Sequence, residues 1–373
     1  MEERTGGEKR IEELRVRLKG AREAYYNLSG SPMSDQEYDA LKDELSRLAP
    51  EDHEVTAIGA SVSKFSVWEK VRHEIPMGSL GKVNSESEYR EWAQKAESNG
   101  GQVTVITHKI DGSSMELVYK SGALVRCVTR GDGVIGEDVT DNVVKISSIP
   151  RMLKKPVDAT IRGEVVMLKD VFAEKYSSEY ANPRNTAAGK VREKKGGGEA
   201  CKDLVFLAYW VMMDGGPKTV WASMGWLQKE KFIVPDYFPC TNADAVCEAH
   251  AAIGAKRGSL EYEIDGTVVS VNSLEVLEEM GSHNMRPRGQ VAWKFDAATC
   301  ESRVVDVKWQ VGPSGRITPV AVVEPVGVGG VTVTNVSLHN LSMFRELRLT
   351  RGCRVLISRR NDVIPFIEKN LDA

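Results

Sequence analysis

Lysine and carboxylate side chains occur at several places along the chain where they could act together on a phosphate. The stretch THKIDGSS holds Lys109 and Asp111, two positions apart. In a strand, residues i and i+2 face the same way, so both side chains would project together while Ile110 points into the core. A lysine so placed can act as a nucleophile once its amine loses its proton, which requires its pKa to fall from about 10.4. Taken alone, the stretch would by default be interpreted as a surface salt bridge.

Three further stretches supply the same residue types. RGEVVM contains Glu164, EIDGTVVSV contains Asp265 and VAWKF contains Lys294. Lysines flanked by apolar residues often extend to the surface. Because Lys294 alternates with Trp293 and Phe295, we expect it instead to face a site opposite the core.

A glycine motif lies between these stretches. In TRGDGVIGEDVT, residues Gly131, Gly133 and Gly136 match G-x-G-x-x-G. A dinucleotide-binding fingerprint ends a strand and opens a helix. The following EDVTDNVVKISSIP is short, rich in β-branched residues and stopped by Pro150, which makes a poor crossover helix. We therefore expect a glycine-rich turn beside a site; an NAD-linked dehydrogenase remains an alternative that rests on this motif alone.

The elements that must position these residues change in character along the chain. Apolar residues recur at helical spacing over 8–28, and Ser34 with Glu37 forms a capping box for a second helix, so a helical hairpin is expected. From about 76, short β-type runs alternate with turns, with helical patterns at 85–97, 169–180, 221–231 and 273–280.

These patterns predict an α+β protein with antiparallel sheets rather than βαβ alternation. The expected strands lie at 103–107, 115–129, 159–167, 203–212 and 265–271. After about 300, strand-like runs recur between Gly and Pro turns, which favours a small β-barrel. We expect three domains: 1–60, 61–298 and 299–373.

Composition limits the class of protein. The chain has 373 residues, of which 41% are hydrophobic and 28% charged, an ordinary globular balance. It shows no apolar run of membrane-spanning length and no signal peptide, so we expect no membrane association. Six cysteines without a C-x-x-C pair favour free thiols in a reducing cytoplasm and argue against a zinc finger. The net charge is −3, yet 184–202 carries six basic and two acidic residues and 301–373 carries ten and seven, giving +4 and +3.

The order of motifs carries a family resemblance. K-x-D-G, R-G-E, D-G-T-V-V and W-K-F resemble the nucleotidyltransferase core of polynucleotide ligases and capping enzymes, with its ATP-grasp-like adenylation fold. More narrowly the chain is similar to the NAD-dependent DNA ligases. The supporting stretches are HEIPMGSL, TRGDGVIGEDVTDNV, ANPRNTAAGKVR, QVGPSGRITPVAVVEPV, VSLHN and NDVIP. The likeness implies that the last domain is an OB-fold.

The resemblance implies roles for the acid and lysine residues. Lys109 would be the nucleophile that becomes adenylated, and Asp111 beside it would help position metal or the attacking hydroxyl. Glu164 would contact the AMP ribose. Asp265 would be a metal-side carboxylate, and Lys294 would neutralise the α-phosphate. No residue is assigned as a dedicated metal ligand.

Other positions are implied for the rest of the cosubstrate. The arginines expected near the AMP or nick phosphates are Arg130, Arg184, Arg192 and Arg257. The adenosine pocket would be lined by Ser79 and Leu80. In the helical hairpin, the positions that would grip the nicotinamide mononucleotide (NMN) half of NAD are Tyr25, Tyr26, Asp35, Tyr38 and Asp39. Aromatic faces can stack on a nicotinamide ring. ATP-dependent ligases lack this module, so it would select NAD.

The activity implied is the sealing of nicks in duplex DNA with NAD and Mg²⁺, through a lysyl-AMP and a DNA-adenylate. The expected protein is a monomer in the cytoplasm of a bacterium or a virus-infected cell. Its partners would be NAD and nicked duplex DNA. The zinc, helix-hairpin-helix and BRCT modules common in the family are not found, which suggests a short form.

Two positions depart from the family pattern. Thr107 stands where an acidic residue recognises adenine, and Ser270 stands where a lysine stabilises charge on the α-phosphate. Losing one such preorganised donor typically costs about 10²–10³ in rate. An NAD- or nick-binding homologue with impaired or no ligation is therefore the alternative function.

Overall fold

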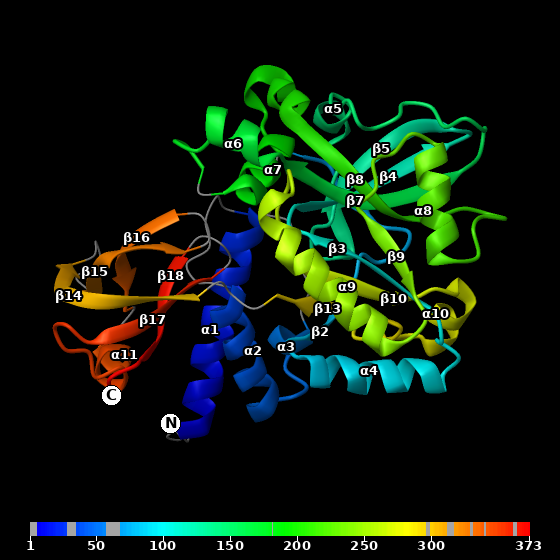
Figure 1. Ribbon diagram of the computed structural model, residues 1–373. Coiled ribbons are helices and arrows are strands. Elements are labelled where there is room, and N and C mark those ends of the chain that lie inside the picture. Colours follow the sequence, from blue (N-terminus) through cyan, green and yellow to red (C-terminus); the bar gives the residue numbers. More distant parts are fainter. Residues whose placement is uncertain are drawn as a thin grey trace, which may run out of the picture. The chain divides into compact units, whose positions relative to one another are not determined.

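The computed structural model describes residues 6–27, 35–56, 68–180, 182–295, 299–311, 317–328, 331–338, 341–360 and 364–373. The chain forms two compact units, one of Met1–Pro32 with Lys42–Phe295 and one of Met33–Leu41 with Asp296–Ala373. Figure 1 shows the elements in chain order. In the described part, no helix is both long and apolar enough to cross a membrane.

The N-terminal segment is helical, as its periodicity predicts. Its helices are α1 (Gly6–Asn27), α2 (Asp35–Leu48) and α3 (His53–Thr56). Leu18 of α1 and Leu45 of α2 are fully buried, and Arg10 joins the two helices through bonds of 2.7 and 2.8 Å to Glu44. Ser34 of the expected capping box lies outside the described residues.

A five-stranded sheet carries the lysines. Its order is β2 (Gly81–Val83), β13 (Gln290–Lys294), β10 (Ile264–Val271), β3 (Thr104–Ile110) and β9 (Tyr237–Cys240). Every pairing is antiparallel except that of β13 with β2. Helices α4 (Glu86–Ser98) and α9 (Ala243–Lys256) cover one face, where Tyr89, Val246 and Ile253 pack against Trp293. The expected helix at 85–97 is confirmed, whereas α9 had no counterpart among the expected helices.

The second sheet is antiparallel throughout. Its order is β5 (Ala123–Thr129), β4 (Ser113–Lys120), β7 (Ala159–Met167) and β8 (Leu204–Met212). Ser121 and Gly122 connect β4 to β5 with φ of 48° and 82°, as a tight hairpin turn requires. One face forms a core with α5 (Thr140–Val143), α7 (Pro183–Val191) and α8 (Val220–Lys229). The strands expected at 115–129, 159–167 and 203–212 are confirmed.

The glycine motif forms a turn between two strands. It joins β5 to β6 (Ile135–Glu137), which pairs with β1 (Lys70–Arg72). Gly131 and Gly133 have φ of 58° and 88°, and a Cβ on Gly131 would lie 1.8 Å from the carbonyl oxygen of Ile135. A turn that enters a strand instead of a helix does not provide a Rossmann site. The dehydrogenase alternative is therefore wrong in its structural premise.

The second unit contains a curled sheet of five strands. Its order is β16 (Val331–Ser337), β15 (Ile317–Val328), β14 (Thr299–Val311), β17 (Arg354–Arg360) and β18 (Ile364–Asn370). The edge strands β16 and β18 approach each other without a hydrogen-bonded ladder in the described residues, so the sheet is a half-barrel. Val304, Val336, Val355 and Ile367 lie in its core, and α11 (Leu341–Glu346) follows β16.

Short elements complete the first unit. They are α6 (Lys169–Lys175), the 3₁₀ turns η1 (Lys195–Asp203) and η2 (Arg257–Ser259), α10 (Leu274–Met280), β11 (Ser282–His283) and β12 (Arg286–Pro287).

Candidate active site

Two lysines flank a glycine across three neighbouring strands. Gly266 of β10 is in register with Lys109 of β3 on one side and with Lys294 of β13 on the other. Residues in register across a sheet present their side chains on the same face. Because Gly266 has no side chain, β10 can pass between the two lysines with its backbone close to that of β13: a Cβ on Gly266 would lie 2.3 Å from the Trp293 carbonyl oxygen. The two lysines therefore share one face of the sheet, and Lys294 alternates with the buried Trp293, as expected.

The opposite face fixes this orientation. Trp293 stacks against Tyr89 of α4 at 4.7 Å and against His250 of α9 at 4.0 Å between ring centroids. Ile106, one side-chain row away from Trp293, is fully buried on the same side. Burial of these large side chains holds β3 and β13 so that Lys109 and Lys294 face away from the core.

Asp265 joins the lysine row. Lys109 Nζ donates to both carboxylate oxygens of Asp265 at 2.6 Å. Burial acts to raise the pKa of Asp265, but the positive charges of Lys109 and Lys294 hold that pKa below its usual value. The side chain is thus a carboxylate placed between two cations, suited to orient the lysine amine and to hold a cation bound to a substrate.

Asp111 follows β3 and pairs with an arginine from a helix. Arg184 Nη1 lies 2.5 Å from Asp111 Oδ1. Arg184 stands in the first turn of α7, which Asn182 caps by accepting from the backbone N–H of Asn185 at 2.7 Å. The charge of Arg184 also contributes to the lowered pKa of Asp265. Asp111, Asp265, Lys109 and Arg184 therefore belong to one cluster.

Glu164 enters the same cluster from the second sheet. Ser114 Oγ donates to Glu164 Oε1 at 2.7 Å, while Oε2 is buried without a hydrogen-bond partner among the described residues. Burial raises the pKa of Glu164 to about 7, against the lowering effects of Ser114, Arg184, Arg130 and Lys109. A buried carboxylate oxygen without a partner in the described residues can accept a hydrogen bond from a hydroxyl group of a ligand.

Arg130 reaches the cluster from the glycine turn. Its guanidinium lies 3.4 Å from Ser79 Oγ and 3.4 Å from the Met77 carbonyl oxygen. Its charge acts on Glu164. Leu80 follows Ser79 and is half-buried directly before β2. The turn thus carries Arg130 toward Glu164 and brings the 77–80 segment beside it.

A buried network, not expected from the sequence, holds that segment. His73 Nδ1 lies 2.9 Å from Glu116 Oε1, and Arg162 donates to Glu116 Oε2 at 2.9 and 2.7 Å. Arg162 also bonds the carbonyl oxygens of Ile75 and Pro76. Burial would raise the pKa of Glu116, but His73 and Arg162 hold that pKa below its usual value. The partners lie 43 and 46 positions apart, so no local pattern reveals them.

Tyr209 is a second residue that the sequence patterns did not single out. It lies on β8 beside Glu164: burial raises the pKa of its phenol, and the negative charge of Glu164 raises that pKa further. The aromatic-rich run LVFLAYWVM could have drawn attention to this position. An aromatic ring next to Glu164 offers a surface on which a flat base can stack.

The two departures from the family pattern lie on the face of the five-stranded sheet that carries Lys109 and Lys294, which we call the lysine face. Thr107 is two residues before Lys109 on β3, and its Oγ1 is buried with no hydrogen-bond partner in the described part of the chain. Ser270 Oγ accepts from Gln290 Nε2 at 2.9 Å. Neither position carries a charge.

Most of the remaining residues expected in the site either contact residues outside the Lys109 cluster or have side chains outside the described set. Arg192 Nε bonds Glu137 Oε2 at 2.6 Å, and the Arg257 guanidinium lies 5.9 Å from the Phe295 ring centroid. These two contacts do not connect either arginine to Lys109. Tyr38 is half-buried on α2. The side chains that lie outside the described set are Tyr25, Tyr26, Asp35 and Asp39.

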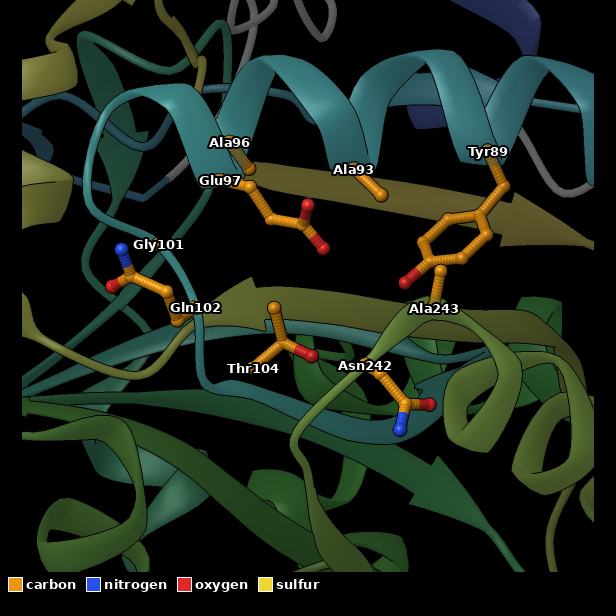
Figure 2. A pocket seen from close by; sticks show the side chains of 9 residues that line it. All are labelled: Tyr89, Ala93, Ala96, Glu97, Gly101, Gln102, Thr104, Asn242 and Ala243. Carbon is orange, nitrogen blue, oxygen red and sulfur yellow. The ribbon is translucent and has the colours of Figure 1, made fainter.

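Neither the pocket beside α4 nor a metal cage belongs to the Lys109 cluster in the described part of the chain. A pocket between α4 and the strands includes Tyr89, Glu97 and Thr104 (Figure 2). Since Thr104 alternates away from Lys109 along β3, this pocket lies on the other face of the sheet. Among the described residues, no group of three His, Cys, Asp or Glu side chains could form a metal cage.

The comparisons with known families cover almost the whole chain. The model of the NAD-dependent DNA ligase adenylation domain matches residues 65–298. That of the DNA ligase-like, N-terminal NAD+-binding domain matches 5–57. That of the NAD-dependent DNA ligase OB-fold domain matches 301–373.

Curated relatives agree with these matches. A DNA ligase of Sorangium cellulosum is 39% identical over 385 residues, which cover 96% of this chain and 56% of that protein. A DNA ligase of Thermomicrobium roseum is also 39% identical and covers 96% of this chain and 55% of its own length. The chain therefore spans about half the length of the curated relatives it matches.

Proposed function

The chain belongs to the NAD-dependent DNA ligase family, and from this premise we propose that it seals nicks in duplex DNA with NAD as adenylyl donor. The observation that carries the proposal is the row of Lys109, Gly266 and Lys294 with Asp265 bonded to Lys109 at 2.6 Å. It places an amine nucleophile and a second cation in one row on one face of the sheet, which fits attack on a phosphorus.

The first step transfers the adenylyl group to the protein. Lys109 Nζ attacks the adenylyl phosphorus of NAD, and an N–P bond forms. The bond from that phosphorus to the bridging oxygen breaks, and nicotinamide mononucleotide leaves with the electron pair. The attacking amine gives up a proton, for which Asp265 is the adjacent acceptor. Lys294 and Arg184 neutralise charge on the phosphate oxygens.

Contacts to the rest of AMP follow from the second sheet. Glu164 Oε2 is buried and without a partner among the described residues, and it accepts a hydrogen bond from a ribose hydroxyl. Tyr209 offers a ring for the base, and Ser79 with Leu80 lines the adenosine side. Arg130 supplies a further positive charge near the phosphate.

The later steps use the same cluster. The 5′-phosphate of a nick attacks the lysyl-AMP phosphorus, the N–P bond breaks, and the Lys109 amine leaves with a proton taken from Asp265 or water. The 3′-hydroxyl then attacks the DNA 5′-phosphorus and gives its proton to water, while the bond from that phosphorus to AMP breaks and AMP leaves as the phosphodiester forms. Nicked duplex DNA is the partner we assign, with Arg192 and Arg257 as further candidates for phosphate contacts.

Mg²⁺ fits this donor set only together with substrate phosphates. Asp265 and Asp111 are carboxylates, but each is paired with a cation, and the described residues offer no three-ligand cage. Mg²⁺ is commonly bound by one or two carboxylates plus phosphate oxygens. When bound, it would shield phosphate charge during in-line transfer. Asp265 is the residue we assign to hold it.

The helical hairpin is proposed to bind the NMN half of NAD. The match to an NAD+-binding domain model over 5–57 supports this. The candidate residues are Tyr25, Tyr26, Asp35, Tyr38 and Asp39. Six unpaired cysteines suit a reducing cytoplasm, where we propose that the protein acts as a monomer.

A nick-sealing assay with end-labelled duplex tests the function. Sealing is expected with NAD and not with ATP, and Lys294→Gln should slow it about 10²–10³-fold because one phosphate-neutralising cation is lost. The matched control is Lys120→Gln, since Lys120 is exposed on β4 and pairs with Asp158. Equal sealing by both variants and the unmodified protein would contradict the assignment of Lys294.

A further inference from the structure

We propose that Thr107, Ser270 and Gln290 form a neutral base-recognition patch that accepts 6-amino and 6-oxo purines alike. The protein would then use NAD and its deaminated analogue, nicotinamide hypoxanthine dinucleotide, with similar efficiency. The inference rests on the proposed function, because it takes the lysine face to be the nucleotide site.

The patch lies on the same face as the nucleophile. Thr107 is in register with Val268, one side-chain row from the Lys109–Gly266–Lys294 row. Ser270 is in register with Gln290, one row further along β10. Each row step spans two residues, roughly 7 Å along a strand. A base attached to a phosphate at Lys109 can therefore extend over these rows.

The middle row places two apolar side chains beside Thr107. Val268 is in register with Ala292 as well as with Thr107, and Ala292 is small and buried. Small apolar side chains beside a few polar groups are the usual lining of a base site. The polar groups at its edge then decide which base is accepted.

Thr107 is the polar group without a partner. The residue is 6% exposed, yet its Oγ1 forms no hydrogen bond within the described residues. A buried hydroxyl without a partner costs free energy. A ligand atom on the lysine face removes that cost, so the orphaned hydroxyl points to a ligand contact.

Ser270 and Gln290, like Thr107, have neutral side chains that can both donate and accept hydrogen bonds. Ser270 is 3% exposed, and its hydroxyl accepts from the Gln290 amide at 2.9 Å. A hydroxyl and an amide can each donate and accept. A carboxylate at this edge would only accept, so it would bind a 6-amino group and repel a 6-oxo group. The neutral patch has no such preference.

The test uses the full chain and two readouts. Calorimetry measures the Kd of AMP and of inosine monophosphate (IMP), and intact mass follows nucleotidyl transfer to Lys109 from NAD and from nicotinamide hypoxanthine dinucleotide. In transfer from the analogue, the same N–P bond forms and NMN leaves. We expect the two bases to differ by less than about 5-fold in affinity and in rate, since each can make one neutral hydrogen bond.

Three variants test whether Thr107 determines the affinity for the two bases. Thr107→Val, nearly equal in volume, should weaken AMP and IMP together by about 3- to 10-fold through loss of that bond. Thr107→Glu should create a preference for AMP of about tenfold or more. Thr104→Val is the matched control, because Thr104 is a buried threonine on the other face of β3, and it should change neither ratio nor affinity. Thermal unfolding shows that each variant is folded.

The outcomes separate this inference from the proposed function. Equal binding of AMP and IMP without a covalent adduct would refute adenylation while supporting the patch. A preference of the unmodified protein for AMP above about 5-fold would overturn the inference. So would unchanged affinities in Thr107→Val, or failure of both mononucleotides to bind.

Discussion

Glu164 is a carboxyl group whose burial opposes its ionisation. One oxygen accepts from Ser114, the other is buried without a partner in the described residues, and burial raises its pKa to about 7. Such a carboxyl is close to half ionised at neutral pH. A ligand hydroxyl that donates to it would stabilise the ionised form.

The raised pKa predicts a specific pH dependence of stability. A raised carboxyl pKa contributes stability that is present below about pH 4.5 and is lost as pH rises through about 7. Without nucleotide, the unmodified protein should lose up to about 3 kcal/mol relative to Glu164→Gln between pH 5 and 8. Denaturant unfolding at several pH values measures this difference. A constant difference across the range would contradict the burial of Glu164, and Glu74→Gln, on an exposed side chain, is the control.

At the scale of elements, the site depends on close packing of the three strands β3, β10 and β13, which hold the two lysines in one row. A Cβ on Gly266 would lie 2.3 Å from the Trp293 carbonyl oxygen and 2.9 Å from the Lys294 Cα. Trp293 cannot yield, since Tyr89 and His250 hold its ring from the other face. Glycine is thus required at this position of β10 because the two backbones approach closely.

Substitution of this glycine should affect both folding and chemistry. Gly266→Ala should lower the free energy of unfolding by about 1–3 kcal/mol through overpacking, and should slow adenylation by moving Lys294. Gly225→Ala is the control: a Cβ there meets nothing within 4 Å, and alanine in α8 should stabilise by about 0.5–1 kcal/mol. Denaturant midpoints compare the two. Equal stability of Gly266→Ala and the unmodified protein would show that β10 and β13 are not closely packed.

The elements also show where sequence reasoning succeeds. Alternation of Lys294 with Trp293 and Phe295 predicted that Lys294 faces away from the core, and the structure places it in one row with Lys109. The helix α9 was not expected because its alanines mask the apolar period, leaving Val246 and Ile253 as its buried residues. Glu116 was not expected because its partners are distant in sequence.

At the scale of the whole molecule, the charge is unevenly distributed. The net charge is −3, yet residues 301–373 carry ten basic and seven acidic side chains, giving +3. Binding of duplex DNA by such a surface would release counterions from phosphates. The proposed partner therefore implies a marked dependence on salt.

That dependence can be measured by titrating nicked duplex at several salt concentrations. The logarithm of the association constant should fall linearly with the logarithm of salt concentration, by about 0.9 for each phosphate neutralised. Lys308→Ala, which removes an exposed cation of β14, should reduce the slope by about 1. A slope near zero would exclude phosphate binding as the source of affinity.

Transfer of the adenylyl group of NAD to Lys109 is measured most directly by intact mass after incubation with NAD and Mg²⁺. One added AMP is expected on the unmodified protein and none on Lys109→Ala. Absence of the adduct from folded protein that was not already adenylated, or its persistence in Lys109→Ala, would contradict the account.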